Sequence, residues 1–139
     1  MRLTWIGLVL VALLGCGDVP PHAVLPLSPS GNLTLHVSNQ SFALETVDID
    51  VLVDGKLAVT GDFDVGSQHS WYTFRIDVPG GAHTVRAVSA RGEVMNELAI
   101  EIVDGDAYVV VSFWYDPRLR VDPNREMSIT FHEDPVTFD

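Results

Sequence analysis

The stretch VDIDVLVDGKLAVT, from Val47 to Thr60, decides the fold class of this chain. Valine or isoleucine occupies every second position from Val47 to Val53, and aspartate fills most of the positions between them. This period of two is typical of a β-strand with one buried face. Asp54-Gly55 then predicts a tight hairpin, and the residues from Lys56 to Thr60 predict the returning strand.

The same alternation continues on both sides of this hairpin, in residues 33–38, 73–78, 85–89, 98–103 and 127–131. Pro79-Gly80-Gly81 and Asp104-Gly105-Asp106 predict turns between strands. The run YVVVSFWY, from Tyr108 to Tyr115, is apolar at both parities, which indicates a central strand or one at a domain contact. No segment has a sustained helical period. We therefore expect an all-β protein, an antiparallel β-sandwich of about 7–9 short strands in one domain over residues 32–139.

Part of this region resembles known surface modules. The segment from Asp48 to Gly92 contains VDGKLAV and then FRIDVPGGAHTVRAVSARG. It is similar to bacterial immunoglobulin-like and fibronectin-like modules, in which a proline-glycine turn precedes a strand of the form H-T-V-x-A. It also resembles the PEGA surface domain, although the threonine-proline step of PEGA repeats is missing. The resemblance implies an immunoglobulin-like sandwich, and it says little about activity.

The first fifteen residues have the properties of a signal peptide. Arg2 supplies a positive charge, and an almost wholly apolar run follows from Leu3 to Leu14. That run is shorter than the roughly 20 residues that a membrane-spanning helix requires. Its length fits the apolar region of an export signal, so we expect residues 1–15 to be removed.

The end of this segment, Leu13-Leu14-Gly15-Cys16, resembles the lipobox of bacterial lipoproteins. In that family a diacylglycerol is attached to the cysteine thiol, and a peptidase recognises the preceding residues and cuts before the cysteine. Cys16 is the single cysteine of the chain, so no intramolecular disulfide competes for its thiol. The resemblance implies a protein anchored to the cell envelope by lipid on Cys16. Gly17, rather than an aspartate, directly follows the cysteine, which favours the outer membrane over the inner membrane.

Residues 16–31 are expected to form a tether between the lipid and the domain. Pro20, Pro21, Pro26 and Pro29 lie in this segment, and proline removes backbone donors. The composition predicts neither helix nor sheet. The fifteen residues from Gly17 to Gly31 would reach about 45 Å if extended, at about 3.1 Å per residue.

The charge of the chain limits the classes of molecule that it can bind. The chain has 8 basic and 19 acidic residues, for a net charge of −11. Such a field repels phosphate backbones, so we exclude nucleic acid as a partner. Membrane binding is expected through the lipid anchor alone, and another envelope protein is the expected partner. Arg118, Arg120 and Arg125 form a separate basic segment, which either is a solvated loop or docks a carboxylate.

Asp48, Asp50, Asp62 and Asp64 are the candidate metal ligands. Calcium prefers six to eight oxygen ligands, several of them from carboxylates, but these residues do not have the spacing of an EF-hand loop. The alternative interpretation is a solvated sheet face whose charges prevent edge pairing. No firm metal site and no cofactor other than the covalent lipid are predicted.

His69, Trp71, Tyr72 and Trp114 are the candidate binding residues, because polar groups beside aromatic rings suit a binding patch. Alternatively, these aromatic rings close one end of the core. No catalytic motif is present. We expect a non-enzymatic binding or adaptor module. A calcium- or ligand-binding surface module and a small hydrolase are the alternatives.

Overall fold

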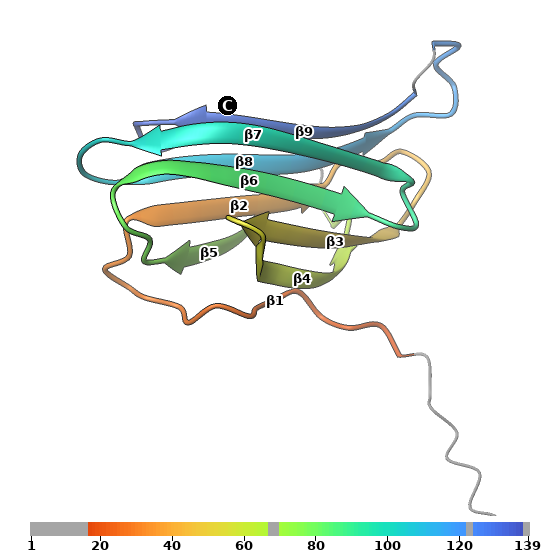
Figure 1. Cartoon of the computed structure of the whole chain (residues 1–139). Coiled ribbons are helices and arrows are strands. Elements are labelled where there is room, and N and C mark those ends of the chain that lie inside the picture. Colours follow the sequence, from red (N-terminus) through yellow and green to blue (C-terminus); the bar gives the residue numbers. More distant parts are fainter. Residues whose placement is uncertain (1–16, 67–69, 122–123, 138–139) are drawn as a thin grey trace, which may run out of the picture.

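The computed structural model describes residues 17–66, 70–121 and 124–137. The predicted signal peptide and lipobox, including Leu13, Leu14, Gly15 and Cys16, lie outside the described residues, as does His69. The strands of the described part (Figure 1) are β1 (His22–Ala23), β2 (Leu33–Asn39), β3 (Thr46–Val53), β4 (Lys56–Asp64), β5 (Tyr72–Ile76), β6 (Gly81–Ser89), β7 (Val94–Ile102), β8 (Ala107–Tyr115) and β9 (Arg125–His132).

These strands form two sheets that pack face to face as a β-sandwich. Sheet A has the order β1-β4-β3-β6-β7, and sheet B has the order β5-β2-β8-β9. The all-β class and the expected number of strands are confirmed. One pairing departs from a wholly antiparallel arrangement, because β2 and β8 run parallel at the centre of sheet B. Within the described part of the chain, no helix has the length and apolarity needed to cross a bilayer.

The core contains the residues of the predicted inward parity. In β3, Val47, Ile49 and Val51 are fully buried, and the aspartates between them face outward. Phe63 and Phe113 are the largest fully buried side chains. Each buried side chain of this size contributes roughly 1.5–3 kcal/mol to folding. The prediction of a central strand over Tyr108–Tyr115 is also confirmed, because β8 lies between β2 and β9.

The hairpin between β3 and β4 has the predicted turn. Asp54 has a φ of 51° and Gly55 a φ of 76°, and positive φ at both central residues defines the turn that matches the twist of two strands. The two other predicted turns connect strands of different sheets. Residues 77–80 lead from β5 in sheet B to β6 in sheet A, and residues 103–106 lead from β7 in sheet A to β8 in sheet B.

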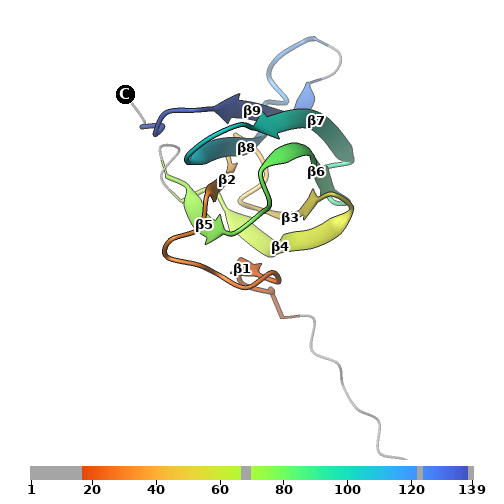
Figure 2. The ribbon, with the colours of Figure 1, turned by 60° about the vertical axis from the view of Figure 1, so that its left-hand side comes forward.

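The expectation that the proline-rich segment forms neither helix nor sheet is wrong. His22–Ala23 forms β1, which pairs antiparallel with β4. The Val24 N–H donates to the Ala58 carbonyl at 2.8 Å, and the Ser28 N–H donates to the Arg75 carbonyl at 2.9 Å. We call residues 19–28 the strap, because they run along the sandwich from the outer edge of β4 towards β5 (Figure 2). The expected spacer of about 45 Å is therefore not formed by these residues.

The position of the strap at the edge of a sheet explains why a segment with prolines can pair there. Outer strands expose unpaired N–H and C=O groups, and proline is tolerated on an edge because its missing donor faces away from the sheet. The residues between the prolines supply the donors and acceptors that pair with β4. Gly61 permits this approach, because a Cβ at that position would lie 2.6 Å from the Pro21 Cα.

On the opposite side of the sandwich, the edge strands β7 and β9 lie next to each other (Figure 1). The Asn96 side-chain amide donates to the Met127 carbonyl at 2.8 Å, and Arg125 forms an ion pair with Glu93 at 2.9 Å. Side chains rather than a backbone ladder therefore connect the two sheets on this side.

Candidate functional site

The two outer faces of the sandwich have opposite chemical character. The outer face of sheet A is acidic, and its carboxylates are Asp48, Asp50, Asp62, Asp64, Glu97 and Glu101. On the outer face of sheet B, the described strand residues are mostly hydroxyl-bearing, aromatic or imidazole side chains. They are Thr34, His36, Ser38, Thr73, Tyr108, Ser112, Trp114, Ser128, Thr130 and His132. Histidines aside, the only charged side chains on the described strands of this face are Arg75 and Glu126.

Three rings form a row across the outer face of sheet B. The ring centroids of Trp71 and His36 are 4.6 Å apart, and those of His36 and Tyr108 are 6.4 Å apart with nearly parallel planes. A hydrogen bond of 2.9 Å joins His36 Nδ1 and the Thr73 hydroxyl, which fixes the orientation of the imidazole. Burial lowers the pKa of His36, because it disfavours the charged imidazolium.

Next to the row lies a strip of buried polar groups. The Ser38 and Ser112 hydroxyls are 3.1 Å apart, and both residues are almost fully buried. Gln40 is only 3% exposed, and its Nε2 has no hydrogen-bond partner among the described residues. Polar groups buried in this way usually have partners, because an unsatisfied buried donor costs about 1–3 kcal/mol.

The predicted binding residues are only partly brought together. Trp71 belongs to the aromatic row, and the exposed Trp114 lies on the same face of sheet B. Tyr72 has the opposite parity, and its ring packs edge-on against Phe63 at 5.2 Å. The Tyr72 ring therefore packs at the edge of the core, where the residue is 37% exposed.

His36 and Tyr108 were not among the predicted binding residues. Both residues face outward from their strands, as the alternation of apolar and polar residues in the sequence predicts. Their proximity depends on the parallel pairing of β2 with β8, in which Thr34 lies opposite Tyr108. No local pattern in the sequence indicates that pairing.

The acidic face is held together by hydrogen bonds within the protein. Asp48 lies directly opposite Asp62, and Arg91 reaches over both carboxylates. Burial opposes ionisation of Asp48, but the backbone N–H groups of Arg91 and Ala90 and the Ser89 hydroxyl donate to its carboxylate. These hydrogen bonds hold the pKa of Asp48 below its ordinary value.

The other two candidate metal ligands also have protein partners. Asp50 accepts a hydrogen bond from the Thr60 hydroxyl at 2.5 Å, and Asp64 accepts one from the Thr46 hydroxyl at 2.7 Å. Among the described residues, no group of three or more histidine, cysteine or acidic side chains is placed to hold a metal ion. Each of the four candidate metal ligands therefore has a hydrogen-bond or ion-pair partner within the protein.

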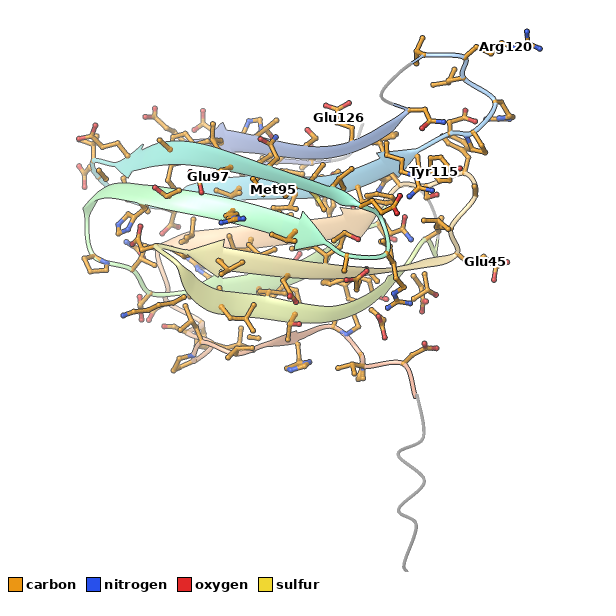
Figure 3. All side chains as sticks on the ribbon, turned by 45° about the vertical axis from the view of Figure 1, so that its right-hand side comes forward. Glu45, Met95, Glu97, Tyr115, Arg120 and Glu126 are labelled. Atoms are coloured by element: carbon orange, nitrogen blue, oxygen red, sulfur yellow. The ribbon has the colours of Figure 1, made fainter. Side chains whose placement is uncertain are left out.

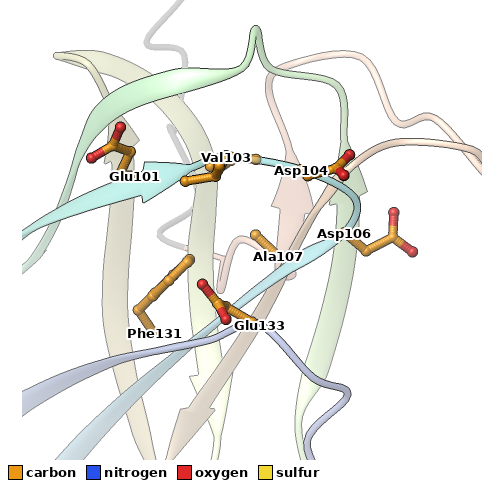
Figure 4. Close-up of a pocket in the computed structure, with 8 residues that line it drawn as sticks. Glu101, Val103, Asp104, Asp106, Ala107, Phe131 and Glu133 are labelled. Carbon is orange, nitrogen blue, oxygen red and sulfur yellow. The ribbon is translucent and has the colours of Figure 1, made fainter.

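The hollow in Figure 4 surrounds the turn from β7 to β8, at the end of the sandwich far from Asp48 and Asp62. It has a volume of about 260 Å³ and is lined by Glu101, Asp104, Asp106 and Glu133 together with apolar residues. Asp106 forms an ion pair with Arg75 at 2.9 Å. The lining contains no serine, cysteine or histidine, and its titratable groups are the four carboxylates.

No family model, curated protein or solved structure matches this chain. The chemistry of the faces and of the loops is therefore the basis for a functional proposal.

Proposed function

We propose that this protein is a lipid-anchored lipoprotein of the bacterial cell envelope, with the outer membrane favoured. Its sandwich is a non-enzymatic module that binds another envelope protein through the outer face of sheet B. The anchor is the lipid on Cys16, following the resemblance of Leu13-Leu14-Gly15-Cys16 to a lipobox. Two or more acyl chains hold a protein stably on a membrane without a spanning helix.

The contrast between the two outer faces is the observation that carries the binding proposal. The centres of protein interfaces are depleted in charge and enriched in aromatic residues. The outer face of sheet B has this character, with the Trp71–His36–Tyr108 row and the exposed Trp114. The acidic face of sheet A suits solvent, because its carboxylates repel one another and would lose hydration in an interface.

Photo-crosslinking in cells tests the binding face. A photoreactive residue at the exposed Thr130 of sheet B is compared with one at the exposed Ala99, on the outer face of sheet A. We expect one defined crosslinked species from Thr130 and none from Ala99, and we expect Trp114→Ala to reduce its yield severalfold. Crosslinking from Ala99 alone, or a yield that Trp114→Ala leaves unchanged, would contradict the assignment of the face.

Mass spectrometry and fractionation test the anchor. We expect the mature protein to begin at Cys16, to carry acyl chains and to partition with membranes. Cys16→Ser should leave the protein uncut and without lipid. An unmodified Cys16 thiol on the mature protein would show that the lipoprotein assignment is wrong.

A further inference from the structure

The strap fixes which end of the sandwich lies next to the proposed anchor. The Asp62 N–H donates to the Val19 carbonyl at 2.6 Å, and the Val19 N–H donates to the Asp62 carboxylate at 2.7 Å. Only Gly17 and Asp18 separate Cys16 from this attachment. The three steps from Cys16 to Val19 span at most about 11 Å, so a lipid on Cys16 holds the body of the domain close to the bilayer.

The same end of the sandwich carries the loops that follow β2 and β8. Asp62 lies near the last residue of β4, and the Asn39 side chain at the end of β2 donates to the neighbouring Phe63 carbonyl at 3.1 Å. Asn39 in turn lies opposite Phe113 of β8. Figure 3 shows Glu45, Tyr115 and Arg120 on this side of the molecule, with Arg120 in the loop that projects beyond the strands.

These loops present an apolar tip, which we define as Phe42, Arg118, Leu119, Arg120 and Val121. Phe42, Leu119 and Val121 are 51%, 53% and 61% exposed. The Arg118 guanidinium lies 5.0 Å from the centre of the Phe42 ring, and no ion pair of Arg120 occurs among the described residues. Apolar side chains flanked by arginines suit a membrane interface, where apolar groups enter the acyl boundary and guanidinium groups reach the phosphates.

The opposite end of the sandwich has a different composition. Its exposed turn from β7 to β8 contains Val103 between acidic residues that include Asp104 and Asp106, and the exposed Leu27 lies apart from it in the strap. Carboxylates also occur at the anchored end, and Asp116 there is paired with Arg118 at 2.8 Å. What distinguishes the anchored end is that two exposed apolar side chains, Leu119 and Val121, share one projecting loop with Arg118 and Arg120.

We propose that the apolar tip contacts the same phospholipid bilayer that the lipid on Cys16 enters. The sandwich then stands upright on the membrane, with its strands rising from the surface and the outer face of sheet B accessible from the side. This inference rests on the proposed lipid anchor. It excludes a domain that is held away from the membrane by a stalk.

Depth-dependent fluorescence quenching tests the contact. Leu119→Cys is labelled with an environment-sensitive fluorophore in the full lipidated protein and reconstituted into vesicles of phosphatidylethanolamine and phosphatidylglycerol that contain spin-labelled lipid. Val103→Cys is the matched control, because Val103 is 80% exposed at the opposite end. Val121→Cys repeats the test at a second position of the tip if the first variant fails to fold.

We expect severalfold stronger quenching and a blue-shifted emission at Leu119, and emission as in water at Val103. Equal quenching at the two positions, or none at either, overturns the contact. Labelling of the parent protein separates this failure from failure of the anchor. A Cys16 thiol that reacts with the fluorophore, together with a protein that does not float with the vesicles, would refute the anchor itself.

Discussion

The pair formed by His83 and Asp54 makes the stability of this protein depend on pH in a defined direction. His83 is buried, and its two ring nitrogens lie 2.6 Å from the Asp54 carboxylate and 2.5 Å from the Pro79 carbonyl. Both partners are acceptors, and only an imidazolium has two N–H donors. The hydrogen bond to Asp54 is the main cause that raises the pKa of His83, and the same bond lowers the pKa of Asp54.

Asp54→Asn isolates this interaction. The Thr84 N–H donates to the other oxygen of Asp54 at 2.9 Å, and an asparagine oxygen replaces that acceptor. Asparagine also tolerates the φ of 51° at this turn. The variant therefore removes the negative charge and little else. A hydrogen bond between charged groups contributes about 1.5–3 kcal/mol. Because the Asp54 carboxylate is about half exposed, we expect a loss of about 1–2 kcal/mol below about pH 6.

The loss should disappear at high pH. The folded-state pKa of His83 lies above the unfolded value of about 6.5, so the stabilisation is complete below that pH and is lost as the pH rises through the folded pKa. Urea unfolding followed by tryptophan fluorescence measures the difference between variant and parent from about pH 5.5 to about pH 9.5. Asp64→Asn is the control, because Asp64 accepts from a threonine and has no histidine partner in the described part of the chain. A difference for Asp54→Asn that stays constant over this range would refute the reasoning.

Three further outcomes are expected in urea unfolding. Gly61→Ala should cost about 1–3 kcal/mol, because its φ is 146° and the new Cβ would meet Pro21; the control Gly105→Ala, with a φ of 73° and open space, should cost about 1 kcal/mol. Phe113→Ala should cost about 3–5 kcal/mol, because it leaves a cavity in a fully buried position; a loss below about 1 kcal/mol would show that the site is not close-packed. Arg91→Ala should cost about 0.5–1 kcal/mol by leaving two facing carboxylates uncompensated, and about 1 M salt should remove most of this loss.

The sequence predicts the strands and their inward faces well, because alternation is a local property. Val47, Ile49 and Val51 are buried as expected, and Asp54-Gly55 forms the expected turn. In these cases the signal and the structure that it specifies involve the same few residues, so no distant partner is needed.

The parts that the sequence does not predict depend on distant partners. The strap is an example, since its prolines indicate the absence of regular structure while the residues between them pair with β4. Gly61 is the one local signal of this contact, and a glycine within a strand equally indicates a bulge or a bend. The compensation of Asp48 by Arg91 and the pairing of Asp54 with His83 join residues 43 and 29 positions apart. The pattern of neighbouring residues predicts an acidic face there but not the groups that neutralise it.

The parallel pairing of β2 with β8 has a consequence for the order in which this chain becomes structured. Leu33 of β2 lies opposite Ala107 of β8. The chain therefore makes β2 long before it makes β8, the strand with which β2 has its longer pairing. Until then its apolar residues and one backbone edge are available to other chains. Contacts between residues so far apart slow folding and prolong exposure to aggregation. We therefore expect the unfolded chain to depend on chaperones until β8 has paired with β2.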